Sequence, residues 1–196
     1  METYWGPKLW EELRSLEPHT VCERCNVVYD SAGFYEVDSL GKTVKVYPQE
    51  ERLEADDLLP ADSVDYQLLL VSYLLYAQNI DLTGIWVSEK DLKGGSLFFR
   101  GPHTLPSAPI EKCFGNDPAG FREKSQIMGG QPIDFGDTAM RFTILPRISF
   151  AVVLWVRDEE FPARVTFMLD SSIEAHLPLD VISAMVLSLT QKLISL

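Results

Sequence analysis

The stretch VDYQLLLVSYLLYAQ, residues 64–78, decides the fold, because as a helix it is apolar around nearly its whole circumference. A helix of that kind is buried on most sides, so it is expected at the centre of the molecule. Asp62 is the expected N-cap, and Asp65 in the first turn complements the positive end of the helix dipole.

Helices are also expected at both ends of the chain. The first is opened by Gly6-Pro7, ends before Pro18 and carries one apolar stripe, formed by Leu9, Trp10, Leu13 and Leu16. The last runs from about 179 to 194, with its stripe formed by Val181, Ile182, Met185, Val186, Leu189 and Leu193. Residues 108–128 predict one or two short helices broken at 115–118.

The predicted strands come in runs and do not alternate with helices. Residues 26–47 indicate three short strands, NVVYD, GFYEV and KTVKVY, and residues 83–106 a strand followed by a Gly/Pro-rich loop. Further strands are expected at 138–145, 148–156 and 161–169, and EERLEADD (50–57) is expected to be an acidic surface segment. The fold class is therefore α+β: a largely antiparallel sheet, a buried central helix and flanking N- and C-terminal helices, in a single domain over 1–196.

Strands 148–156 and 161–169 predict a hairpin with a four-residue turn at 157–160. In that register Phe150 faces Phe167, and every pair on one face is apolar. A slip of one residue would move these side chains to the other face. The same register places Arg147 opposite Asp170 as a cross-strand ion pair.

The second face of this hairpin has small residues in its middle, with Arg147, Arg164 and Trp155 around them. One hypothesis is a pocket wall for a small anionic ligand, because Arg matches carboxylate and phosphate geometry and Trp supplies apolar contact. The alternative is an ordinary sheet face half covered by a loop or by strand 138–145. A tight turn at 146–147 is not expected, since its register would place Arg141 in the core.

The net charge of −12 in 196 residues and the lack of Lys/Arg clusters argue against nucleic acid and anionic membranes as partners. No apolar run approaches the roughly 18–20 residues that span a bilayer, and the N-terminus lacks the pattern of a signal peptide. A soluble cytoplasmic protein is expected.

Cys22-x-x-Cys25 is the first candidate for chemistry. A structural zinc site needs four ligands, which here would require Cys22, Cys25 and Cys113 to converge with a histidine. A thioredoxin-like pair would need its first cysteine at a helix N-terminus, whereas this pair follows a helix and precedes a strand. We interpret the three residues as ordinary thiols and predict no metal site.

Other motifs are weaker. Lys93-Gly94-Gly95-Ser96 could bind phosphate, but it lacks the spacing of a phosphate loop and a following helix, so a turn is the commoner interpretation. Asp170-Ser171-Ser172 with His176 could be catalytic, although such a sequence before a helix is more often a cap. The acids at 158–160 could hold a cation, yet acids at a loop tip are usually solvated.

Several segments in the second half resemble the family known as domain of unknown function 3786. These are DLTGIWVSEKDLKGGSLFF, FGNDPAGF, LPRISFAVVLW, RDEEFPARVTFMLDSS and LPLDV, and the likeness runs from about the first helix to the last. The resemblance implies occurrence mainly in anaerobic bacteria and archaea, and no established activity that any residue inherits. Some relatives carry an added iron–sulfur segment with four clustered cysteines; this chain has none.

Three functions follow as hypotheses, in this order. The first is a small-molecule or cofactor-binding domain serving anaerobic metabolism, with ligand contacts from Arg147, Trp155, Arg164, Asp170, Lys93, Gly94 and Gly95. The second is an interaction module for a partner protein, and the third is an enzyme of unrecognised type using Asp170, His176 or Glu160 as acid or base. The sequence identifies no cofactor.

Overall fold

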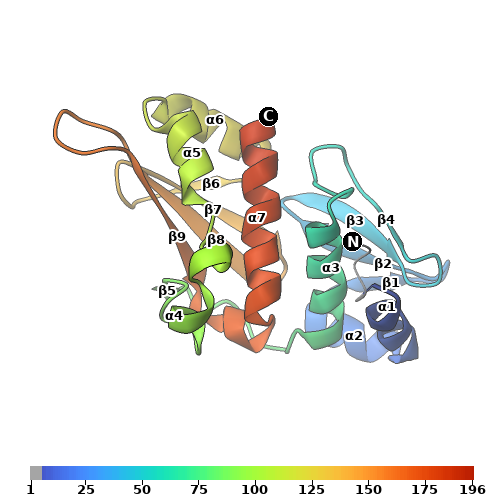
Figure 1. Cartoon of the computed structure of the whole chain (residues 1–196). Coiled ribbons are helices and arrows are strands. Elements are labelled where there is room, and N and C mark those ends of the chain that lie inside the picture. The colour runs from blue at the N-terminus through green and yellow to red at the C-terminus, as the bar shows by residue number, and fades with distance from the viewer. Residues whose placement is uncertain (1–5) are drawn as a thin grey trace.

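The computed structural model describes residues 6–196 and has two antiparallel sheets on either side of a central pair of helices (Figure 1). The first sheet, in the order β1-β2-β3-β4, consists of Val28–Asp30, Phe34–Ser39, Lys42–Tyr47 and Arg52–Glu54. The second, in the order β5-β9-β8-β7-β6, consists of Trp86–Val87, Arg164–Asp170, Ile148–Trp155, Thr138–Leu145 and Gln131–Ile133. The predicted α+β class is confirmed.

The central pair is α3 (Val64–Tyr76) and α7 (Leu179–Ser195), which pack against each other. All residues from Leu69 to Leu75 are buried, as predicted for the central helix. Two buried tyrosines tie α3 to its surroundings: the Tyr66 hydroxyl donates to Ser39 Oγ at 2.6 Å, and the Tyr73 hydroxyl donates to the Cys25 carbonyl at 2.7 Å. The N-cap is Ser63, without a side-chain hydrogen bond, so the prediction of Asp62 as the cap was wrong.

The remaining helices are short. They are α1 (Gly6–Ser15), α2 (Pro18–Cys25), α4 (Gly95–Phe98), α5 (Ser107–Phe114) and α6 (Pro118–Ile127), with 3-10 turns at Gly101–His103 and Ser171–Ala175. The break at 115–118 is confirmed. The sequence does not predict α2: Pro18 ends the first helix as expected, and it also opens a new one, since proline suits the first helical position. The acidic segment 50–57 contains the edge strand β4. Within residues 6–196 no helix has the length and apolar character needed to cross a membrane.

The hairpin of β8 and β9 has the predicted faces but not the predicted register. Phe150 pairs with Leu169 and Val152 with Phe167, a shift of two residues from the expected pairs. Because side chains alternate with period two, a shift of two leaves every side chain on its predicted face. The apolar face is buried, with Phe150 and Phe167 stacked diagonally at 6.4 Å between ring centroids.

The expectation against a tight turn between β7 and β8 was also wrong. The strands meet at Pro146-Arg147, and a bulge between Thr143 and Leu145 shifts the register by one residue. Because the bulge adds one residue to β7, Phe142 lies opposite Phe150. Phe142 therefore enters the core, and Arg141 lies on the other face.

The second face of this sheet is partly covered by the loop before β7. Gly136 lies against Val153 and Trp155, and an added Cβ there would come within 2.7 Å of Val153 Cγ1. Ala139, Ala151 and Val153 are buried on this face. The sequence left two possibilities for this face, one wall of a pocket or an ordinary face half covered by a loop or by strand 138–145. A loop covers part of the face, and a pocket lies at one end of it.

Candidate functional site at the loop end of the hairpin

The two arginines expected to share a pocket lie at opposite ends of the β8–β9 hairpin. Arg147, at one end, is 8% exposed and bonds to its own chain with every nitrogen. Its Nε donates to the Arg24 carbonyl at 2.9 Å, and its terminal nitrogens donate to Asp81 Oδ1 and Asn79 Oδ1, both at 2.5 Å. The predicted ion pair with Asp170 is therefore wrong, and Arg147 fastens the loop after α3.

Asp170 fastens the next part of the same loop. Its Oδ1 accepts from Thr83 N, Thr83 Oγ1, Ser172 N and Ser172 Oγ, and its Oδ2 accepts from Gly84 N at 2.8 Å. Burial alone would raise the pKa of this carboxyl, but the hydrogen bonds from Ser172 and Thr83 outweigh it and hold the pKa below its usual value. The Asp170 carboxylate therefore has a structural role. It caps the 3-10 turn Ser171–Ala175, which agrees with the interpretation of Asp-Ser-Ser as a cap.

The three residues considered as acid or base do not form one site. His176 is buried, its Nδ1 accepts from Gln78 N at 3.3 Å, and its Nε2 has no partner in the described part of the chain. Burial, with Arg147 nearby, lowers the pKa of His176, while Asp170 opposes the shift. Glu160 is exposed in the loop at the other end of the hairpin.

Lys93, Gly94 and Gly95 form a tight turn. The Lys93 amide donates to the Glu174 carboxylate, and Gly94 has φ of +79°, which favours glycine. A Cβ on Gly95 would lie 2.0 Å from the Glu89 carbonyl oxygen, so the close backbone approach requires glycine. A four-residue helix, α4, follows, contrary to the expectation of no helix. The structure does not bring these residues to Trp155 and Arg164.

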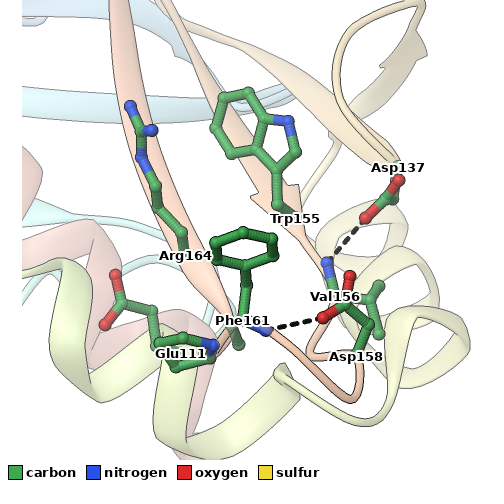
Figure 2. Close-up of a pocket in the computed structure, with 9 residues that line it drawn as sticks. Glu111, Asp137, Trp155, Val156, Asp158, Phe161 and Arg164 are labelled. Atoms are coloured by element: carbon green, nitrogen blue, oxygen red, sulfur yellow. Dashed lines mark hydrogen bonds between the residues drawn. The ribbon is translucent and has the colours of Figure 1, made fainter.

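Trp155 and Arg164 do come together, at the loop end of the hairpin, where residues 156–163 join the two strands. They are directly paired across β8 and β9, and the guanidinium lies over the Trp155 ring at 5.1 Å from its centroid. Beside them is a pocket of about 600 Å³, within the size range of small-molecule sites (Figure 2). Its lining is Glu111, Asp137, Trp155, Val156, Asp158, Phe161, Pro162, Ala163 and Arg164.

An eight-residue loop, 156–163, forms one wall of this pocket in place of the predicted four-residue turn. Asp158 shapes it: its amide donates to the Phe161 carbonyl at 3.1 Å, and its Oδ1 accepts from the amides of Glu160 and Phe161. The loop also docks on the end of α5, where Arg157 N donates to the Gly115 carbonyl at 3.0 Å. A Cβ on Gly115 would lie 2.5 Å from that of Ala163, so glycine permits this close approach.

Each carboxylate of the pocket holds the backbone with one oxygen. Asp137 Oδ2 accepts from Val156 N at 2.8 Å, and Asp158 Oδ1 accepts from the loop, as the dashed lines in Figure 2 show. Glu111 Oε1 accepts from Val165 N at 2.9 Å. The second oxygen of each carboxylate has no protein donor within residues 6–196, so these oxygens are available to a ligand.

Aromatic surface completes the site. Phe161 is 65% exposed although it belongs to a loop with several fixed hydrogen bonds, and Trp155 is half-buried beside it. The pocket therefore offers two aromatic rings, three carboxylates and one guanidinium that already lies over a ring. This arrangement suits a flat apolar group bearing a positive charge.

The cysteines lie apart from this pocket. Cys22 and Cys25 are both in α2, and the Cys25 thiol donates to the Tyr73 carbonyl at 3.4 Å. Burial raises the pKa of Cys25 to about 12, which leaves it a neutral thiol. Cys113 is exposed on α5, and among residues 6–196 no three His, Cys, Asp or Glu side chains gather as metal ligands would.

Sequence reasoning missed Glu111, Asp137 and Phe161 as site residues. Glu111 comes from α5, 54 positions before its partner Val165, and no local pattern connects the two. Phe161 carried a signal, since a phenylalanine beside three acids and a proline is more hydrophobic than a solvated turn needs.

Comparison with known proteins gives one match. The family model described as "Domain of unknown function (DUF3786)" matches residues 17–192, which is most of the chain. No curated protein and no solved structure matches.

Proposed function

The chain belongs to the DUF3786 family, and we propose that it is a small-molecule-binding protein whose ligand occupies the pocket at the loop end of the β8–β9 hairpin. One observation carries the proposal: Trp155 and the exposed Phe161 border a pocket with three carboxylates that each keep a free oxygen. Two aromatic rings with a few open polar groups around one concavity are the composition that small-molecule sites have.

The ligand class follows from the charges. Three acidic groups and one arginine favour a cation over an anion, and the rings add cation–π attraction of about 0.5–2 kcal/mol. The anionic ligand predicted from the sequence depended on Arg147 joining Arg164, and Arg147 instead bonds to Asp81 and Asn79. Service in anaerobic metabolism, a cytoplasmic location and a single domain stay predictions from the sequence.

Three matched probes test the charge preference: phenethylamine, 2-phenylethanol and phenylacetate, each titrated while tryptophan fluorescence is followed. We expect binding in that order of decreasing affinity. The signal should disappear in Trp155→Phe, which separates it from the signals of the other tryptophans. Tighter binding of phenylacetate would instead support the anionic ligand, and no binding of any probe would contradict a small-molecule site.

A pair of variants tests the role of Phe161. Phe161→Ala should weaken phenethylamine binding about fivefold, the equivalent of roughly 1 kcal/mol for one aromatic contact. Val28→Ala is the control, because Val28 is 61% exposed on β1 of the other sheet. Equal effects of the two substitutions would remove Phe161 from the site.

A partner protein is the second candidate function, favoured by the loop between α3 and β5. Residues 78–85 are all exposed, including Ile80, Leu82 and Ile85, yet Arg147 and Asp170 hold the loop in place. Several large apolar side chains exposed together on a fixed loop form the kind of surface that protein interfaces use. A partner that binds wild type and Phe161→Ala, but not Ile85→Asp, would support this function over the first.

A further inference from the structure

A second cavity of about 320 Å³ lies along the outer edge of β9, between β5 and α5. It is lined by Ser88, Glu89, Lys90, Thr104, Leu105, Ser107, Arg164, Val165, Thr166 and Phe167. Arg164 also lines the first pocket, so the two spaces adjoin along the strand.

The hydrogen bonds around β9 show which backbone groups face this edge. Ser171 N donates to the Ile85 carbonyl, Leu169 pairs with Val87, and Val165 N donates to Glu111. Since N–H and C=O directions alternate along a strand, all odd-numbered residues from 165 to 171 point these groups outward. Phe167 does so too.

Phe167 is the one position on this edge, between 165 and 171, where the neighbouring chain has turned away. The residue opposite it in the β5 register is Glu89, but a turn closed by Asp91 N donating to the Ser88 carbonyl takes the chain off the strand. Within residues 6–196 no protein group outside the sheet bonds to the outward N–H and C=O of Phe167. Its ring is 3% exposed and packs against Phe150, so its main chain is the part that faces the cavity.

We propose that the second cavity binds one residue of an extended peptide through the free N–H and C=O of Phe167, and that an arginine side chain of the same peptide fills the first pocket. The inference rests on the proposed function for the arginine subsite only. A peptide supplies the antiparallel donor and acceptor that an open strand position lacks. An arginine supplies the flat cation that the rings and carboxylates accommodate.

The bound segment is short, because the neighbouring positions on the edge already have protein partners for their amides. Glu111 takes the Val165 amide on one side, and β5 pairs with Leu169 on the other. One residue of the ligand can therefore form both hydrogen bonds of an antiparallel pair with the strand.

The experiment uses acetyl-Ala-Ala-Arg-Ala-Ala-amide and the full chain labelled with ¹⁵N. On titration, the Phe167 amide should shift downfield and its hydrogen exchange should slow at least fivefold. The amides of Val165 and Leu169 are internal controls, since both already have protein partners. An unchanged Phe167 amide in the presence of a bound peptide would overturn the proposal.

Two modifications of the peptide separate the subsites. N-methylation, scanned along the peptide, should weaken binding about fivefold or more at a single position, because one amide donates to Phe167. Replacing the arginine by norleucine should weaken binding through the first pocket. If phenethylamine binds and no peptide does, the β9 inference fails and the proposed function stands. If the peptide binds with the Phe167 shift but norleucine binds equally well, the arginine subsite fails and the edge pairing stands.

A blocking variant provides an independent check. Thr104→Trp places a large side chain at the mouth of the second cavity and should abolish the Phe167 shift without affecting phenethylamine. Thr43→Trp, at an exposed position on β3 of the other sheet, is the control. Unchanged peptide binding in Thr104→Trp would show that the peptide lies elsewhere.

Discussion

The two ends of the β8–β9 hairpin carry similar residues and differ in how those residues are used. At the end opposite the connecting loop Arg147 and Asp170 are buried, and their charged groups bond to the loop that joins α3 to β5. At the loop end Arg164 and Asp158 are exposed, and a carboxylate oxygen and an aromatic ring face a pocket. The difference teaches that an Arg and an Asp in the same region indicate a binding site only where some of their hydrogen-bonding groups have no partner within the protein.

Exchanging Asp for Asn at each end should have the largest effect on this comparison. Asp170→Asn should lower the free energy of unfolding by about 3 kcal/mol, because five donor contacts from Thr83, Gly84 and Ser172 lose a charged acceptor. Asp158→Asn should lower it by less than about 1 kcal/mol, because its loop is exposed. Urea unfolding measures both, and equal losses would break the comparison.

The arginines form a second matched pair with a smaller difference. Arg147→Met should destabilise by about 2 kcal/mol, since it removes hydrogen bonds to Arg24, Asn79 and Asp81. Arg164→Met should stay within about 0.5 kcal/mol of wild type, because Arg164 is exposed and has no charged partner within hydrogen-bonding distance among residues 6–196. A large loss of stability in Arg164→Met would show that the loop end has a structural role as well.

At the end opposite the loop, His176 should also make the stability depend on pH. Its pKa in the folded state lies below the unfolded value of about 6.5, so the unfolded chain binds more protons. Stability is therefore complete above about pH 6.5 and falls as the pH drops toward the folded pKa, by at most about 1.4 kcal/mol per pH unit. Measurements from pH 7.5 to 5.5 should show this loss, and His176→Gln should flatten it. If the loss persists in His176→Gln, the pH dependence has another source.

The smallest effect concerns the link between α5 and β9. Glu111→Gln should cost only about 0.5 kcal/mol, because the amide oxygen can still accept from Val165 N, although more weakly. Hydrogen exchange at Val165 should nevertheless become faster while that at Leu169 stays constant. An unchanged Val165 amide would mean that Glu111 does not hold this edge.

Much of the fold could be predicted from the sequence because apolar periodicity reports burial. The stretch 64–78 and the stripe from Val181 to Leu193 predicted α3 and α7, which form the central pair. The alternation in β8 and β9 predicted both faces correctly, yet a period of two leaves shifts of two residues undetermined. The register depends on the loop 156–163, whose shape comes from the side-chain bonds of Asp158 and its contact with Gly115.

The site could be predicted only in part, for the same reason. Trp155 and Arg164 are neighbours on one face, which local alternation can show. The positions of Arg147 and Glu111 depend on partners far along the chain, Asp81 and Val165. The bulge between Thr143 and Leu145 has no sequence signal of its own, and without it the β7–β8 turn could not be predicted.

The interrupted outer edge of β9 has a further consequence, for the behaviour of the protein in crowded solution. An uninterrupted strand edge is a template on which molecules join sheet to sheet and aggregate. Here Glu111 holds the Val165 amide and β5 pairs with Leu169, so among residues 6–196 only Phe167, between them, has both its N–H and its C=O open on this edge. One unpaired position is too short to fix the register of an intermolecular ladder, so this edge resists fibril growth and stays open to a short ligand.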